Sequence, residues 1–203
     1  MDSKDMYNVL EWGYDKALNG LPGTETVAEL AEDYMKGNGS LESKVNDFIK
    51  WQKAKCFTSG FITGLGGLPL MPVTVPANIS SVIYVQLRMV AAIAYIGGYD
   101  VRDDRVKTMV YACLCGDSAK RILKDAGIEV GKKMAVSFIK KVPTEVILKI
   151  NRPVGFKLVT KFGEKGIVNL GKAVPVLGGL ISGAVDYAAA DTVGNAAKKI
   201  FIG

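Results

Sequence analysis

The chain has 203 residues, a net charge of +6 and a mean hydropathy of +0.20. That length fits one large domain or two small ones, and the hydropathy lies between soluble domains and multi-span membrane proteins. There is no histidine, so the commonest general base and metal ligand are missing. The three cysteines cannot complete a four-ligand zinc site. We therefore expect no metal or other cofactor, and free thiols in a reducing cytoplasm.

Residues 1–40 are predicted to form acidic surface helices that pack on the core. Thr26 and Glu29 have the spacing of a capping box, and Ser40 opens a third helix. The acidic, amphipathic start of the chain differs from a signal peptide, which has a basic start and an apolar run. The apolar stripes of these helices favour docking onto a shared core.

The next segment, Cys56–Leu87, holds 32 consecutive residues without a formal charge. Its length suggests a membrane span, but the three prolines in its middle prevent a continuous helix. In the following apolar window, 77–96, Arg88 lies near the midpoint and would cost roughly 2.5–3.5 kcal/mol in a bilayer. Two apolar helices joined by a proline-rich elbow therefore fit better than a standard span.

The remainder of the chain also reads as helical. Asp100 and Asp103 are predicted to cap a helix that ends at Gly116, and two helical patterns follow through Val142. Arg152-Pro153 is expected to break the segment 144–163, and Pro175 to open a last, glycine-rich helix that ends near Phe201. Because sustained alternation of apolar and polar residues is absent, the sequence predicts an all-α, single compact domain.

Small residues and prolines mark where these helices could approach closely, either in a membrane or in a tight soluble core. Buried charges nearby need partners, so an Arg88–Asp186 ion pair is predicted to tie the apolar hairpin to the last helix. A nucleotide-binding loop is excluded, because no Lys-Ser/Thr follows the glycines. The residues predicted for helix packing or insertion are Gly60, Gly64, Gly67, Pro69, Pro72, Pro76, Gly179 and Gly183.

Charge is divided unevenly along the chain. Residues 1–50 hold ten acidic and five basic residues, whereas Lys120–Lys172 holds thirteen basic and four acidic ones. This basic segment favours an anionic partner, with a solvated lysine face as the plainer alternative. Nucleic acid is not expected, because the three phenylalanines of the segment fall on apolar stripes. The residues predicted to meet an anionic surface are Lys132, Lys133, Lys140, Lys141, Lys157 and Lys161.

Three stretches together resemble the EcsC protein family: "GFITGLGGLPLMPVTVPANI", "LRMVAAIAYIGGYD" and "KFGEKGIVNLGKAVPVLGGLISGAVDYAAADTVGNAAKKIF". The similarity runs from about Leu41 to Phe201, so residues 41–203 are predicted to form the EcsC-like helical domain. The family is named for a gene beside an ABC transporter. The resemblance implies a bacterial, helical, membrane-associated protein, and it supplies no established catalytic residues.

The leading hypothesis from the sequence is a non-enzymatic protein at the inner face of the cytoplasmic membrane. Its basic helices would bind anionic lipid, with or without insertion of the apolar hairpin, as a transporter-associated factor or a membrane-perturbing effector. The alternative is a soluble carrier of a lipid or other apolar ligand. An enzyme is the third option, and its candidate residues would be Asp100, Asp186 and Lys165.

Overall fold

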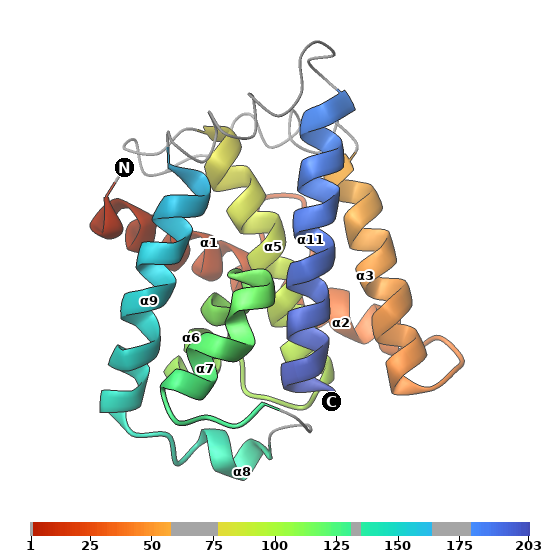
Figure 1. The fold of residues 1–203 in the computed structure, drawn as a ribbon. Helices are drawn as coiled ribbons and strands as arrows, with labels where there is room; N and C mark the ends of the chain where they lie inside the picture. Colours follow the sequence, from red (N-terminus) through yellow and green to blue (C-terminus); the bar gives the residue numbers. More distant parts are fainter. Residues whose placement is uncertain (1, 58–76, 131–134, 164–179) are drawn as a thin grey trace.

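The computed structural model describes residues 2–57, 77–130, 135–163 and 180–203, with the side chains of 55–57, 77–78 and 180–187 outside the described part. Within these ranges the chain is all-α and has no β-strand, as the sequence predicts (Figure 1). The helices are α1 (Ser3–Asn19), α2 (Val27–Met35), α3 (Leu41–Phe57), α5 (Ala77–Ile96), α6 (Asp104–Cys113), α7 (Ala119–Asp125), α8 (Val136–Ile139), α9 (Thr144–Phe162) and α11 (Leu180–Phe201), with a 3-10 turn, η1 (Gly116–Ser118), before α7.

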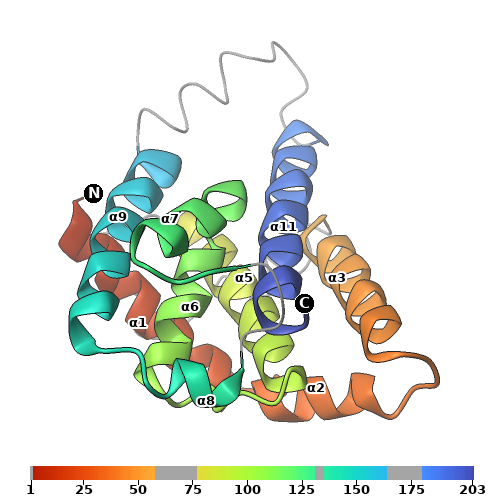
Figure 2. The same cartoon turned by 60° about the horizontal axis from the view of Figure 1, so that its bottom comes forward.

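Helix α5 is the centre of the domain. It contacts α1, α2, α3, α6 and α11, and both ribbon views place it inside the bundle (Figures 1 and 2). Its segment Ile79–Ile96 has a mean hydropathy of 1.6, and 89% of these residues are buried. By length and composition, α5 is the one helix of the described chain that could cross a membrane. In this fold its apolar surface is covered by protein.

The acidic helices α1 and α2 lie against α5. The capping box of Thr26 and Glu29 is present: the Thr26 hydroxyl accepts from the Glu29 amide, and the Glu29 carboxylate accepts from the Thr26 amide. Asp2 and Asp5 form a second capping box at the start of α1. These local bonds explain where both helices begin.

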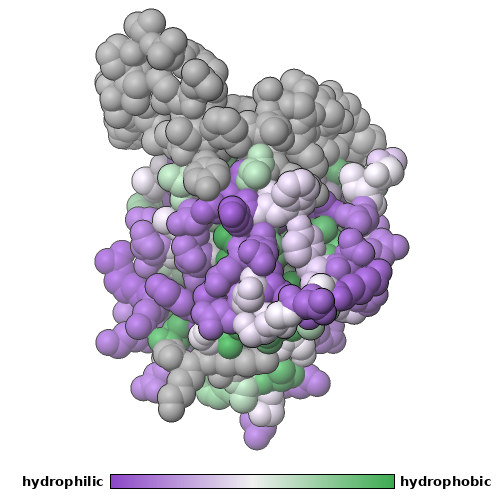
Figure 3. Space-filling view, turned by 90° about the vertical axis from the view of Figure 1, so that its right-hand side faces the viewer, coloured by the Kyte–Doolittle hydropathy of each residue, from purple (hydrophilic) through white to green (hydrophobic). Residues whose placement is uncertain are grey.

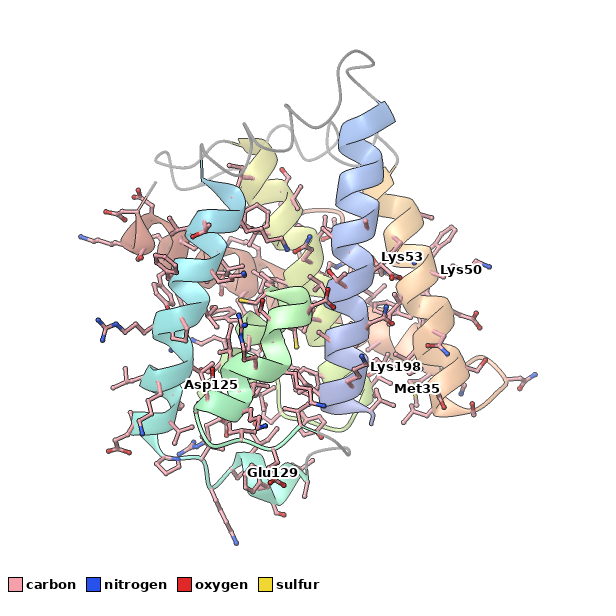
Figure 4. All side chains as sticks on the ribbon, in the orientation of Figure 1. Met35, Lys50, Lys53, Asp125, Glu129 and Lys198 are labelled. Atoms are coloured by element: carbon pink, nitrogen blue, oxygen red, sulfur yellow. The ribbon has the colours of Figure 1, made fainter. Side chains whose placement is uncertain are left out.

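Helix α11 packs along α3 on the side opposite α9 (Figures 1 and 2). Gly194 allows close approach here, since a Cβ at this position would lie 2.8 Å from Ile49 Cγ2. Ion pairs follow the same seam, with Lys53 bound to Asp191 and Lys198 Nζ 2.7 Å from Glu42 Oε1 (Figure 4). The surface seen from this side is mainly hydrophilic (Figure 3).

The structure corrects the predicted boundaries between residues 100 and 142. Asp103 alone caps α6, accepting from the Arg105 amide at 2.8 Å, while Asp100 forms the preceding turn. The helix ends at Cys113, because the chain turns into η1 at Gly116, where φ is +57°. The helical pattern predicted through Val142 yields only the four-residue helix α8 within the described residues.

The predicted break at Arg152-Pro153 is wrong. Helix α9 runs continuously from Thr144 to Phe162 with Pro153 inside it. Pro153 is exposed, and the carbonyl that lacks its usual N–H donor belongs to Lys149, also an exposed residue. The buried side of α9 still packs on the core through Ile150, Val154 and Leu158.

Candidate functional site

Helix α9 has two distinct faces. The buried face consists of Ile150, Val154 and Leu158, which follow one another at four-residue spacing and are each fully buried. This face contacts α1, α6 and α7. Four-residue spacing places side chains above one another on a helix, so this row is the centre of the surface that packs α9 onto the domain.

Two contacts with α1 fix the position of α9 along its own axis. The Tyr7 hydroxyl donates a hydrogen bond to the Asn151 carbonyl, one turn before Gly155. Gly155 leaves the room that the Tyr7 ring fills, since a Cβ there would lie 2.9 Å from Tyr7 Cε2. The acidic helix α1 therefore covers the inner side of α9 and leaves its outer side free.

The outer face of α9 carries two large apolar side chains. Leu148 is 63% exposed and Phe156 is 72% exposed, although residues of this size usually pack inside. They lie two turns apart, with Arg152 between them on the same side of the helix. Phe138 on the neighbouring helix α8 is 47% exposed. The apolar stripes on which the sequence places Phe138 and Phe156 are therefore exposed at these two positions.

Beside these apolar side chains lie basic residues that form no ion pair within the described part of the chain. Lys149 and Lys157 are exposed on the row adjacent to Leu148 and Phe156. The ion pairs formed among the described residues lie elsewhere, on α1–α6 and α11. Eight basic side chains between residues 116 and 163 are without an ion pair in the described part of the chain: Lys120, Arg121, Lys124, Lys140, Lys141, Lys149, Arg152 and Lys157.

The six lysines predicted for an anionic surface fall into three groups. Lys140, Lys141 and Lys157 are exposed, as that prediction requires. Lys161 is half-buried, and its ammonium donates to the Leu114 carbonyl at 3.0 Å. The other two, Lys132 and Lys133, lie outside the described residues. The exposed face of α9 adds Lys149 and Arg152, which the sequence analysis did not select.

Arg88 is buried in the middle of α5, with 4% of its surface exposed. Its Nη2 donates to the Glu25 carbonyl at 2.8 Å and lies 3.6 Å from Glu25 Oε2. The guanidinium thus reaches out of the apolar core to the segment that precedes α2. The predicted partner, Asp186, is in α11 but its side chain is outside the described part, so that pair stays a prediction.

The predicted packing or insertion residues lie mostly outside the described ranges. Gly60, Gly64, Gly67, the three prolines Pro69, Pro72 and Pro76, and Gly179 all belong to undescribed segments. Gly183 lies in the first turn of α11. Of the predicted packing between the apolar hairpin and the last helix, the described residues include the contact of α5 with α11.

The candidate catalytic groups do not form a site within the described residues. Asp100 is exposed in a turn, while Lys165 and the Asp186 side chain are outside the described part. Cys113 and Cys115 are free and buried, and burial raises the pKa of Cys115 to about 12 despite the opposing charges of Lys161 and Lys157. Both thiols are therefore poor nucleophiles at neutral pH.

The family model for the EcsC protein family matches residues 24–202, which include every helix from α2 to α11. The chain belongs to the EcsC protein family. The match covers the central helix α5 and the exposed face of α9 alike, and it begins before the predicted domain boundary at residue 40. No curated protein and no solved structure matches the chain significantly.

Proposed function

We propose that this EcsC-family protein is a non-enzymatic peripheral membrane protein that binds anionic lipid through the exposed face of α9. The observation that carries the proposal is the exposure of Leu148 and Phe156 beside Lys149, Arg152 and Lys157, which form no ion pair with another described residue. An amphipathic helix that rests in the headgroup region has this combination, with apolar groups entering the acyl boundary and basic groups beside phosphate.

The expected strength of such binding is the sum of an apolar and an electrostatic contribution. Complete burial of a Leu or Phe side chain contributes about 1.5–3 kcal/mol, and each Lys or Arg near an anionic surface about 1 kcal/mol. Leu148 and Phe156 are already partly covered in the free protein, so each contributes less than the full value. Together with three basic residues they support reversible binding, which weakens with salt but is not abolished by it.

Lipid fits this face better than nucleic acid. Leu148 is aliphatic and offers no ring for base stacking, and the two apolar side chains lie on a convex helix rather than in a groove. Insertion into the acyl boundary needs only a projecting apolar group, whether aliphatic or aromatic. An oligonucleotide that displaces the protein from vesicles would instead favour nucleic acid.

Binding through α9 requires no opening of the domain. Helix α5 is enclosed by five other helices, and its buried Arg88 is hydrogen-bonded to Glu25. Insertion of the apolar hairpin would have to break these contacts, so we propose it only as a second, conditional step. The protein would act at the inner face of the cytoplasmic membrane, as a transporter-associated factor or a membrane-perturbing effector.

Flotation with vesicles tests the proposal. We expect the protein to float with vesicles that contain phosphatidylglycerol, less with pure phosphatidylcholine, and partly in 0.5 M salt. The double variant Leu148→Ser/Phe156→Ser should lose the salt-resistant fraction, whereas Trp51→Ser on α3 should not. Lys149→Gln/Lys157→Gln should lose the low-salt fraction, with Lys4→Gln/Lys50→Gln as the charge-matched control. Equal flotation of all variants would overturn the assignment to α9.

A further inference from the structure

A pocket of about 360 Å³ lies between the last turns of α11 and the segment formed by η1 and α7. Its volume is within the range of small-molecule sites. The two walls meet closely where Gly116 faces Thr192, since a Cβ at Gly116 would lie 2.8 Å from Thr192 Oγ1. Because the pocket is built from other elements than the outer face of α9, what it binds does not depend on the proposed membrane surface.

Two lysines line this pocket from opposite walls, Lys120 on α7 and Lys199 on α11. Both are exposed, and neither forms an ion pair with another described residue. The adjacent Lys198 is engaged differently, since it is bound to Glu42 and Asn46 of α3 (Figure 4). The end of α11 thus directs one lysine to α3 and another to the pocket, where it adds to the charge of Lys120.

The same pocket offers hydrogen-bond acceptors. Asp117 presents a carboxylate. The Asn195 side-chain amide nitrogen donates to an Asp191 carboxylate oxygen at 3.1 Å, and the Thr192 hydroxyl donates to the Ala189 carbonyl at 3.0 Å. The side-chain oxygens of Asn195 and Thr192 can therefore still accept a hydrogen bond from a ligand. Two ammonium groups beside several acceptors fit a molecule that has both an anionic group and N–H or O–H donors.

We propose that this pocket binds a small phosphorylated amine, with its phosphate between Lys120 and Lys199 and its ammonium toward Asp117. Phosphoethanolamine, free or as a lipid headgroup, has this chemistry. Phosphocholine has the same charges but no N–H donor, so it should bind more weakly. Inorganic phosphate should use the lysines alone.

Titration of the full chain by isothermal calorimetry or NMR tests the proposal. We expect phosphoethanolamine to bind at millimolar or lower concentration, and Lys120→Ala and Lys199→Ala each to weaken it at least tenfold. Lys124→Ala, on the same helix but outside the pocket lining, should leave affinity unchanged. Asp117→Asn should weaken phosphoethanolamine but strengthen inorganic phosphate. All three lysines are exposed, so circular dichroism should show a retained fold.

Flotation with vesicles distinguishes a lipid headgroup from free phosphoethanolamine as the ligand. If adding phosphatidylethanolamine to phosphatidylcholine vesicles increases flotation, and Lys120→Ala/Lys199→Ala abolishes the increase, the ligand is a headgroup. Binding of free phosphoethanolamine without that increase identifies a soluble ligand. Absence of binding in both experiments, or binding that the lysine variants do not weaken, would overturn the proposal. Loss of flotation in the Leu148/Phe156 variant alone would leave it intact.

Discussion

Tyr7 and Gly155 define how the N-terminal helix meets α9: the tyrosine ring occupies the space that a side chain at Gly155 would fill. The Tyr7 hydroxyl is hydrogen-bonded to the Asn151 carbonyl one turn away. These contacts lie on the inner side of α9, and Leu148 and Phe156 project from the outer side. Helix α1 passes beside α9 (Figure 1), and Leu148 and Phe156 stay exposed although the two helices are in contact.

A larger residue at Gly155 should separate α1 from α9. Gly155→Val places methyl groups where the Tyr7 ring now lies, and overpacking of this kind costs about 1–3 kcal/mol. Urea denaturation should show that decrease in the free energy of unfolding. Thr160→Val, which introduces the same side chain at an exposed position of α9, should change stability by less than about 0.5 kcal/mol. Equal stability of the two variants would contradict the packing described for Tyr7.

Arg88 should stabilise the fold through the backbone of Glu25 rather than through its carboxylate. The carboxylate is 3.6 Å away and its side chain is 52% exposed, whereas the carbonyl accepts at 2.8 Å. Glu25→Gln should therefore cost less than about 0.5 kcal/mol. Arg88→Ala should cost about 2–4 kcal/mol, because it removes a buried side chain and leaves the carbonyl without this donor. Chemical denaturation of both variants measures the difference.

The predicted Arg88–Asp186 pair can be tested in the same series. A double-mutant cycle of Arg88→Met and Asp186→Asn measures the coupling energy directly. A coupling above about 1 kcal/mol would support the pair, and additive effects would show that Asp186 is not a partner of Arg88.

Stability should decline in alkaline solution, beginning near pH 9. Burial raises the pKa of Cys115 from 9.0 to about 12, so the unfolded chain releases this proton at lower pH than the folded one. The stabilisation is complete below pH 9 and is lost between pH 9 and 12, about 1.4 kcal/mol of it by pH 10. Burial also raises the pKa values of Tyr14 and Tyr111, which extends the decline above pH 10.

Urea denaturation at pH 8 and pH 10 measures this loss. Cys115→Ala should be less stable than the parent at pH 8, because it removes a buried side chain, but should lose less stability on going to pH 10. A parent protein that is equally stable at both pH values would contradict the burial of these groups.

Ile83→Asp should unfold the domain rather than act on membrane binding alone. Ile83 is fully buried in α5, and an unpaired charge there has no partner among the apolar side chains of the core. Circular dichroism should show loss of cooperative unfolding in this variant. Phe156→Asp should keep the parent melting curve, because the side chain is 72% exposed. A folded Ile83→Asp protein would indicate that α5 can leave the core at low cost, as insertion requires.

Much of the fold could be predicted from local sequence signals. Thr26 and Glu29 mark the start of α2 at their capping-box spacing, and the end of the last helix near Phe201 was predicted correctly. Such signals act over one turn of helix, so a single sequence contains them. The predicted helix through Val142 was wrong within the described residues, since periodic apolar residues alone do not fix a helix.

The exposed face of α9 was missed because of one incorrect boundary. With a break expected at Pro153, the residues before and after it were not placed on one helix. A continuous helix separates Ile150, Val154 and Leu158 from Leu148 and Phe156, which then occupy the opposite side. The sequence also could not show that α1, which supplies Tyr7, packs on α9 at Asn151 and Gly155. That contact depends on residues 144 positions apart.

Whether Phe156 enters lipid is the most direct test of the proposed membrane surface. A polarity-sensitive fluorophore can be attached to Phe156→Cys in a Cys56→Ser background, since Cys113 and Cys115 are buried. The same label at Asp47→Cys, on α3 at the opposite side of the domain, provides the control (Figure 2). We predict a blue shift with anionic vesicles at position 156 and none at position 47. An unchanged spectrum at position 156, with the protein bound to vesicles, would contradict the assignment of α9 as the membrane-binding face.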